Sequence, residues 1–73
     1  MKQMRTRDLV KILKRMGCVK GETVGSHTKW TAPEGHATSV VEDTDQAAGT
    51  LRNIQAHLAP EFGEKWLEKE RKK

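Results

Sequence analysis

The sequence offers few residues for a covalent or metal-bound scaffold. Cys18 is the only cysteine among 73 residues, so a disulfide within the chain is excluded. The spacing of this cysteine and the three histidines matches no paired-cysteine or HExxH zinc pattern. We therefore expect no metal site, and the lone cysteine fits a reducing compartment.

Long hydrophobic runs and glycine-rich loops are absent too. No segment approaches the ~18 apolar residues that span a bilayer, and the residues after Met1 lack the apolar core of a secretory signal. This predicts a cytoplasmic protein with no membrane contact. The six glycines are scattered and form neither a phosphate-binding loop nor a dinucleotide-binding motif, so we expect no cofactor.

The residues that are present suit one small domain. Below ~80 residues a single core seldom provides more than ~3–5 kcal/mol of net stability. Hydrophobic residues make up 34% of the chain and charged residues 33%, but the apolar positions are periodic, which argues against disorder.

Basic residues are concentrated at the start of the chain. Residues 1–29 contain eight lysines and arginines against two acidic residues, whereas residues 30–58 contain one against four. A positive field of this kind attracts polyanions such as RNA. It also occurs on surfaces that are merely solvated, so charge alone leaves both interpretations open.

A half-buried helix is predicted from Thr6, as its N-cap, to Met16, with Gly17 in the position that ends it. At ~100° per residue, one side is apolar and the other is basic. The apolar side carries Leu9, Val10, Ile12, Leu13 and Met16, and the basic side carries Arg7, Lys11, Lys14 and Arg15. The basic side either provides solubility or contacts RNA phosphates.

Three short segments rich in β-branched residues follow, and turn residues separate them. A Gly-Ser pair forms the first turn, and Pro33 with Gly35 favours a type I turn in the second. Gly21 predicts a bulge in the first segment. We expect an antiparallel meander with strands over residues 18–24, 27–32 and 37–42.

Side chains alternate along the second of these strands. Thr28 and Trp30 therefore point to one face, and His27, Lys29 and Thr31 point to the other. If the indole of Trp30 enters the core beneath the helices, the imidazole of His27 and the ammonium group of Lys29 lie together on the open face.

The chain then returns to helical periodicity. Leu51, Ile54 and Leu58 share one stripe, with Thr50 as the cap or in the first turn. We expect an α+β fold of order α-β-β-β-α, in which a three-stranded antiparallel sheet has both helices on one face.

The last residues are predicted to form an extension. Pro60 opens a further short helix that aligns Phe62 with Trp66. These aromatic residues either enlarge the core or contact a partner chain. We expect residues 1–58 to form the main domain and residues 59–73 to form a helical extension packed on it.

His27 is the strongest candidate for a catalytic residue. RNA carries its own nucleophile, the 2′-hydroxyl, so cleavage needs a base for that proton, an acid for the departing 5′ oxygen and no metal. An imidazole can serve in either transfer near neutral pH. Lys29 can neutralise the phosphate, and the backbone N–H groups of Gly25 and Ser26 can bind its oxygens. The alternative is a module that binds RNA on the same face without cutting it.

The segments RDLVKILKRMG, GSHTKW and GTLRNIQAHL have the order and spacing found in HicA toxins of bacterial type II toxin–antitoxin systems, and residues 7–58 resemble that family. The resemblance implies a fold like the double-stranded RNA-binding domain. It implies a cytoplasmic mRNA interferase that cleaves RNA without metal, with His27 as its catalytic residue. It also implies a HicB-type antitoxin that neutralises the toxin and can cover its active site.

Gly25, Ser26, Lys29 and Trp30 match common choices in the family. Cys18 departs from it, because an aromatic residue usually follows the glycine there, and residues 60–73 extend beyond the usual end. The pattern predicts neither the RNA sequence preference nor the oligomeric state.

Overall fold

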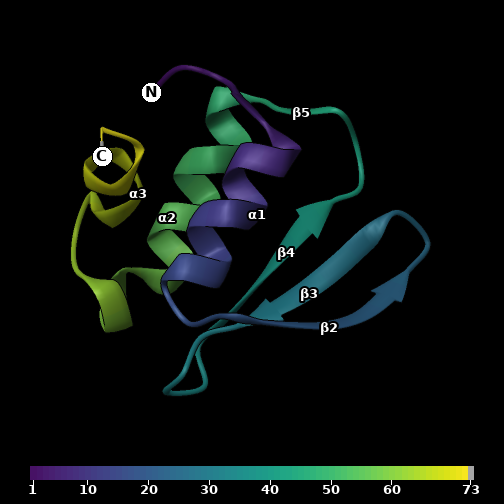
Figure 1. Cartoon of the computed structure of the whole chain (residues 1–73), viewed down its shortest axis with the longest axis horizontal. Coiled ribbons are helices and arrows are strands. Elements are labelled where there is room, and N and C mark those ends of the chain that lie inside the picture. Colours follow the sequence, from purple (N-terminus) through teal and green to yellow (C-terminus); the bar gives the residue numbers. More distant parts are fainter. Residues whose placement is uncertain (73) are drawn as a thin grey trace.

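The computed structural model describes residues 1–72. Two helices lie against one face of a twisted three-stranded sheet, and a third helix lies beyond them on the side away from the sheet (Figure 1). The expected α+β fold, with its antiparallel sheet and its helices, is confirmed. In chain order the elements are β1 (Met4–Arg5), α1 (Thr6–Arg15), β2 (Val19–Val24), β3 (His27–Thr31), β4 (Ala37–Val41), β5 (Asp45–Gln46), α2 (Ala48–Phe62) and α3 (Trp66–Arg71).

Helix α1 ends as its sequence predicts. Gly17 adopts a φ of +89°, a left-handed conformation that costs least at glycine. The N–H of Gly17 donates to Lys14 O (3.0 Å) and the N–H of Cys18 donates to Leu13 O (2.9 Å), which is the pair of bonds of a Schellman motif. The apolar side of α1 is buried at Leu9, Ile12 and Leu13.

The predicted N-cap of α1 is wrong. Thr6 is the first helical residue and Arg5 precedes it without a side-chain capping bond. The hydroxyl of Thr6 instead donates to the backbone oxygen of Asp43 and accepts from the side-chain amide of Gln46. A contact 37 residues away along the chain has therefore replaced the local cap.

The sheet has the order β2-β3-β4 and is antiparallel throughout. Between Lys20 and Thr23 strand β2 carries one residue more than β3 does, which confirms the bulge expected at Gly21. A Cβ at Gly21 would lie 3.2 Å from the backbone oxygen of Lys29, so the close approach of the two strands favours glycine. Strand β3 pairs with β4 without interruption from His27 to Thr31.

A two-residue ribbon was not predicted. Strand β1 pairs antiparallel with β5, with Met4 opposite Gln46 and Arg5 opposite Asp45. The buried amide of Gln46 donates to Val41 O (2.8 Å). This bond ties β5 to the end of β4, and the bond from the same amide to the Thr6 hydroxyl (2.9 Å) ties β5 to the start of α1.

The C-terminal helices differ from the prediction. Helix α2 runs through Pro60 to Phe62, so Pro60 lies in its last turn and does not open a new helix. Gly63 ends α2, and α3 begins only at Trp66. Phe62 and Trp66 therefore belong to different helices, and their rings meet edge to face with centroids 5.2 Å apart.

One core joins the sheet to all three helices. Trp66 and Leu67 of α3 are buried in the same cluster as Trp30 of β3 and Leu51 of α2. The indole N–H of Trp66 donates to Gln55 O (2.9 Å), which satisfies the polar end of a buried aromatic ring.

Candidate active site

His27 and Lys29 lie side by side on the open face of the sheet, because their neighbours on β3 point inward. Trp30 is 2% exposed and Thr28 is 0% exposed, whereas His27 and Lys29 are exposed. Alternation along an uninterrupted strand places the imidazole and the ammonium group on the same face. The arrangement predicted from the sequence is therefore present.

The cross-strand neighbours of His27 are apolar. Val24 of β2 and Val41 of β4 lie opposite it on either side, and Val24 is 73% exposed. Within residues 1–72 the imidazole makes no hydrogen bond or ion pair with another side chain. It is therefore available to a ligand that approaches the open face.

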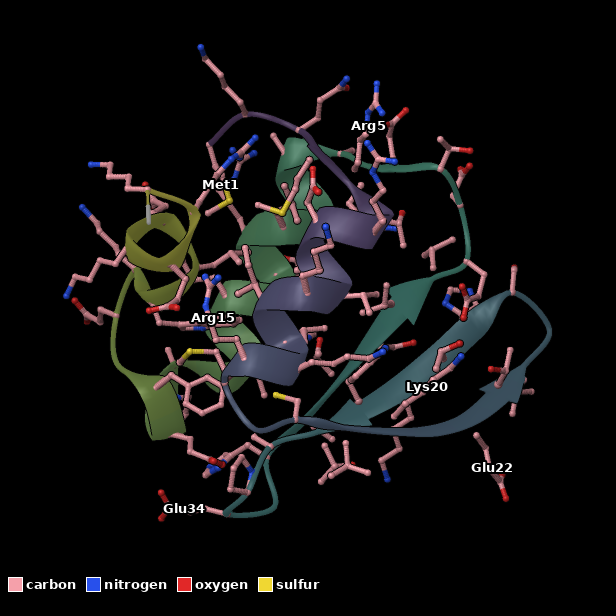
Figure 2. All side chains as sticks on the ribbon, in the orientation of Figure 1. Met1, Arg5, Arg15, Lys20, Glu22 and Glu34 are labelled. Atoms are coloured by element: carbon pink, nitrogen blue, oxygen red, sulfur yellow. The ribbon has the colours of Figure 1, made fainter. Side chains whose placement is uncertain are left out.

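Lys29 has a different setting in the middle of the strand. Ser39 of β4 lies opposite it, and the bulged backbone at Gly21 passes its other side. Figure 2 places Lys20 and Glu22 on β2, at the edge of the sheet away from the helices. The structure thus places the imidazole of His27 and the ammonium group of Lys29 on the same exposed face of the sheet.

Gly25 and Ser26 form the exposed two-residue turn between β2 and β3. Gly25 has a φ of +62°, as a tight hairpin requires at this position. Both residues lie next to His27 at the end of the hairpin, so the structure brings them to the same end of the sheet.

A chain of hydrogen bonds runs beneath His27 on the inner side of the sheet. The Thr23 and Thr28 hydroxyl oxygens are 2.8 Å apart, and the Thr28 hydroxyl donates to a carboxylate oxygen of Glu42. The N–H of Glu42 donates to Ser26 O (2.6 Å). Sequence reasoning missed Glu42, because it lies just past β4 in a segment with no recognisable motif.

The basic side of α1 is not on this face. Arg7, Lys11 and Lys14 are exposed, but α1 packs on the covered side of the sheet and directs them away from the core. Arg15 is engaged with Glu70 of α3: its Nε lies 3.1 Å from Oε1, and its Nη2 donates to the Glu70 backbone oxygen (3.2 Å). Figure 2 shows Arg15 on the side of α1 that faces α3.

A surface depression of about 520 Å³ lies beside α1, away from His27. Lys11 and Arg15 line it together with Asp8 and with Glu70 and Arg71 of α3. Cations and carboxylates are mixed there, and the guanidinium of Arg71 already donates to the backbone oxygens of Lys2 and Gln3. The depression therefore lies where α1, α3 and the N-terminal residues contact one another.

The other two histidines have structural partners. His36 Nδ1 lies 3.1 Å from Oε1 of Glu61, whose side chain is 2% exposed, and His57 Nδ1 lies 3.0 Å from the Thr38 hydroxyl. Burial alone would raise the pKa of Glu61. The bonds from the Glu34 N–H and from His36 outweigh it and hold that pKa below its ordinary value.

Cys18 is buried in the core. Burial, and to a lesser extent the charge of Glu61, raises the pKa of its thiol, which disfavours the reactive thiolate. Over residues 1–72, no three His, Cys, Asp or Glu side chains group as ligands for a metal ion.

Comparison with protein families identifies the family of this chain. The family described as HicA toxin of bacterial toxin-antitoxin matches residues 6–59, from the start of α1 into the last part of α2. Neither the curated proteins nor the solved structures include a match. None of the helices in residues 1–72 has the length and apolar character needed to cross a membrane.

Proposed function

Because the chain belongs to the HicA family of bacterial toxin–antitoxin toxins, which are generally ribonucleases, we propose that it is an mRNA interferase that cleaves RNA without a metal ion. Its catalytic residue is His27. The observation that carries the proposal is the exposed, unpaired imidazole beside Lys29 on the open face of the sheet.

The reaction uses the nucleophile that RNA provides. The 2′-oxygen attacks the adjacent phosphorus, a P–O2′ bond forms and the P–O5′ bond breaks. One product ends in a 2′,3′-cyclic phosphate and the other begins with a 5′-hydroxyl. His27 carries one of the two proton transfers, either from the 2′-hydroxyl or to the departing 5′ oxygen, and such a transfer contributes typically ~10²–10⁴ in rate.

Lys29 supplies positive charge where the phosphate gains negative charge. Its ammonium group shares the open face with the imidazole, so one phosphate can contact both. The N–H groups of Gly25 and Ser26, in the turn before β3, are assigned to the phosphate oxygens. Donors aimed at developing charge stabilise the transition state more than the bound substrate.

The cations of α1 act at longer range. Arg7, Lys11 and Lys14 lie on the helix layer, where they attract the RNA backbone or bind the antitoxin. Arg15 adds to the same field, although its guanidinium is paired with Glu70. The antitoxin is of the HicB type, the complex forms in the cytoplasm, and the antitoxin covers the open face.

The test is cleavage of RNA in the presence of a chelator. We expect wild-type protein to cut, and His27→Ala to lose activity by ~10²–10⁴ while keeping its fold by circular dichroism. His57→Ala is the matched control, because it removes another exposed histidine away from the open face.

Two outcomes contradict the proposal. If wild-type protein retards RNA in a gel but leaves it intact, the protein is an RNA-binding module. If His27→Ala cuts as fast as wild type, another residue carries the proton transfer.

A further inference from the structure

Near His27 the β2–β3 hairpin is packed through β3 alone, at the buried side chain of Thr28. Every residue of β2 is exposed, and the hairpin extends beyond the helices (Figure 1). Tips of this kind usually have high mobility. His27 is the last paired residue of β3 at this end, opposite Val24 and Val41, so contacts just beyond the ladder add to the constraint on its direction.

Hydrogen bonds through Glu42 provide that constraint on both sides of His27. Before His27 in the chain, the backbone oxygen of Ser26 accepts a hydrogen bond from the backbone N–H of Glu42 (2.6 Å). After it, the Thr28 hydroxyl donates to the Glu42 carboxylate. Residue 42 therefore contacts both neighbours of His27: its backbone holds Ser26, and its side chain holds Thr28.

The bond from Thr28 is a strong one for physical reasons. The Thr28 side chain is fully buried, and a buried hydroxyl without a partner costs free energy. A charged acceptor makes the bond stronger than a neutral one. The Thr23 hydroxyl lies 2.8 Å from that of Thr28, so the row of hydrogen bonds continues to β2. The carboxylate of Glu42, just after β4, is thereby connected to β3 and β2.

We propose that Glu42 is a positioning residue for His27. Its carboxylate acts through the hydroxyl of Thr28, and it helps to fix the backbone from which the imidazole projects toward the RNA phosphate. The bond from the Glu42 N–H to Ser26 O is made by the backbone and remains when the side chain is replaced. The inference rests on the proposed function of His27, because it concerns how that residue is held for catalysis. Misplacement by about 1 Å can cost ~10² in rate.

The test compares substitutions that remove the acceptor with those that keep it. Glu42→Ala should lower kcat for an oligoribonucleotide by ~10–100-fold with little change in KM, because substrate binding is not its role. Glu42→Gln keeps an oxygen acceptor for Thr28 and should stay close to wild type. Glu64→Ala, at an exposed position between α2 and α3, removes the same charge and should leave kcat unchanged.

Substitutions of Thr28, which donates to Glu42, should change kcat in the same way. Thr28→Val removes the donor and should lower kcat as Glu42→Ala does, whereas Thr28→Ser keeps the hydroxyl and should restore it. In the double variant Glu42→Ala with Thr28→Val, the two losses should not add, because both remove one interaction. Additive losses in kcat would overturn the proposal. So would a rise in KM with kcat unchanged.

A second readout does not depend on cleavage. In ¹⁵N relaxation measurements, Glu42→Ala should lower the order parameters of His27 and Thr28, and Glu64→Ala should not. If wild-type protein fails to cut RNA, the proposed function fails while this measurement still decides whether Glu42 holds the segment. Unchanged order parameters in Glu42→Ala would show that it does not.

Discussion

At the scale of single residues, the proposed site depends on the exposure of His27 and Lys29 and on the absence of a hydrogen-bond partner for the His27 imidazole within residues 1–72. His27 and Lys29 are exposed on β3, while His36 and His57 each have a partner within the fold. An imidazole with a fixed hydrogen bond inside the protein is less available to a substrate. Exposure without a partner therefore separates His27 from the two other histidines more sharply than its position in the sequence does.

Replacing Lys29 by Ala should lower kcat for RNA cleavage by ~10²-fold, in the range found when one group that stabilises transition-state charge is removed. Lys29→Arg should recover part of this loss because it keeps the charge. Lys20→Ala removes the same charge from β2, opposite Trp30, and is the matched control. Steady-state kinetics on one oligoribonucleotide compare the three, and equal losses in Lys20→Ala and Lys29→Ala would indicate a general effect of charge.

At the scale of elements, local periodicity predicted most of the fold. The apolar stripe of α1, its Gly17 terminus and the alternation along β3 depend on neighbouring residues, so they could be read from the sequence. The end of α1 and the inward direction of Trp30 are confirmed by the Schellman bonds and by burial.

The elements that the sequence did not predict depend on distant contacts. The ribbon of β1 and β5 joins residues about 40 positions apart, and two residues are too few to show a period. The hydroxyl of Thr6 bonds to the backbone oxygen of Asp43 and does not cap α1. Pro60 is accommodated within the last turn of α2. The link from Glu42 to Thr28 likewise follows from strand pairing, which no short motif encodes.

The turn between β3 and β4 is anchored to α2 by an acid-sensitive contact. Glu61 accepts the Glu34 N–H (3.0 Å) and lies 3.1 Å from His36, and its pKa is lowered. A carboxyl with a lowered pKa stabilises the fold at neutral pH. This contribution is lost as the pH falls below the carboxyl's ordinary pKa and through its lowered value.

Glu61→Gln should therefore lower the urea midpoint near neutral pH, and the difference from wild type should shrink as the solution is made acidic. Urea titrations at several pH values measure this, with Glu64→Gln as the control at an exposed position. A difference that stays constant or grows toward acid pH would contradict the role assigned to Glu61.

At the scale of the whole molecule, residues outside the family match complete the core. The match covers residues 6–59, yet Trp66 and Leu67 of α3 are buried with Leu51 and Trp30. Arg71 reaches the backbone oxygens of Lys2 and Gln3, so the two ends of the described chain are joined. We propose that residues 59–72 are part of one domain with the rest.

Trp66→Ala should destabilise the whole protein. Large aromatic truncations in a core cost ~3–5 kcal/mol, and the change also leaves Gln55 O without its indole donor. A core of this size provides about the same net stability, so the free energy of unfolding of the variant should be near zero and about half of it should be unfolded at 25 °C. Urea denaturation checks this against Lys69→Ala, an exposed position on the same helix, and an unchanged midpoint for Trp66→Ala would place α3 outside the cooperative unit.

Chemical rescue tests most directly whether the imidazole of His27 transfers a proton during RNA cleavage. His27→Gly removes the ring and leaves space for free imidazole on the open face. With chelator present, we expect His27→Gly to be inactive alone and to regain cleavage as imidazole is added, with products ending in a 2′,3′-cyclic phosphate. Cleavage by His27→Gly at the wild-type rate without imidazole would contradict the account.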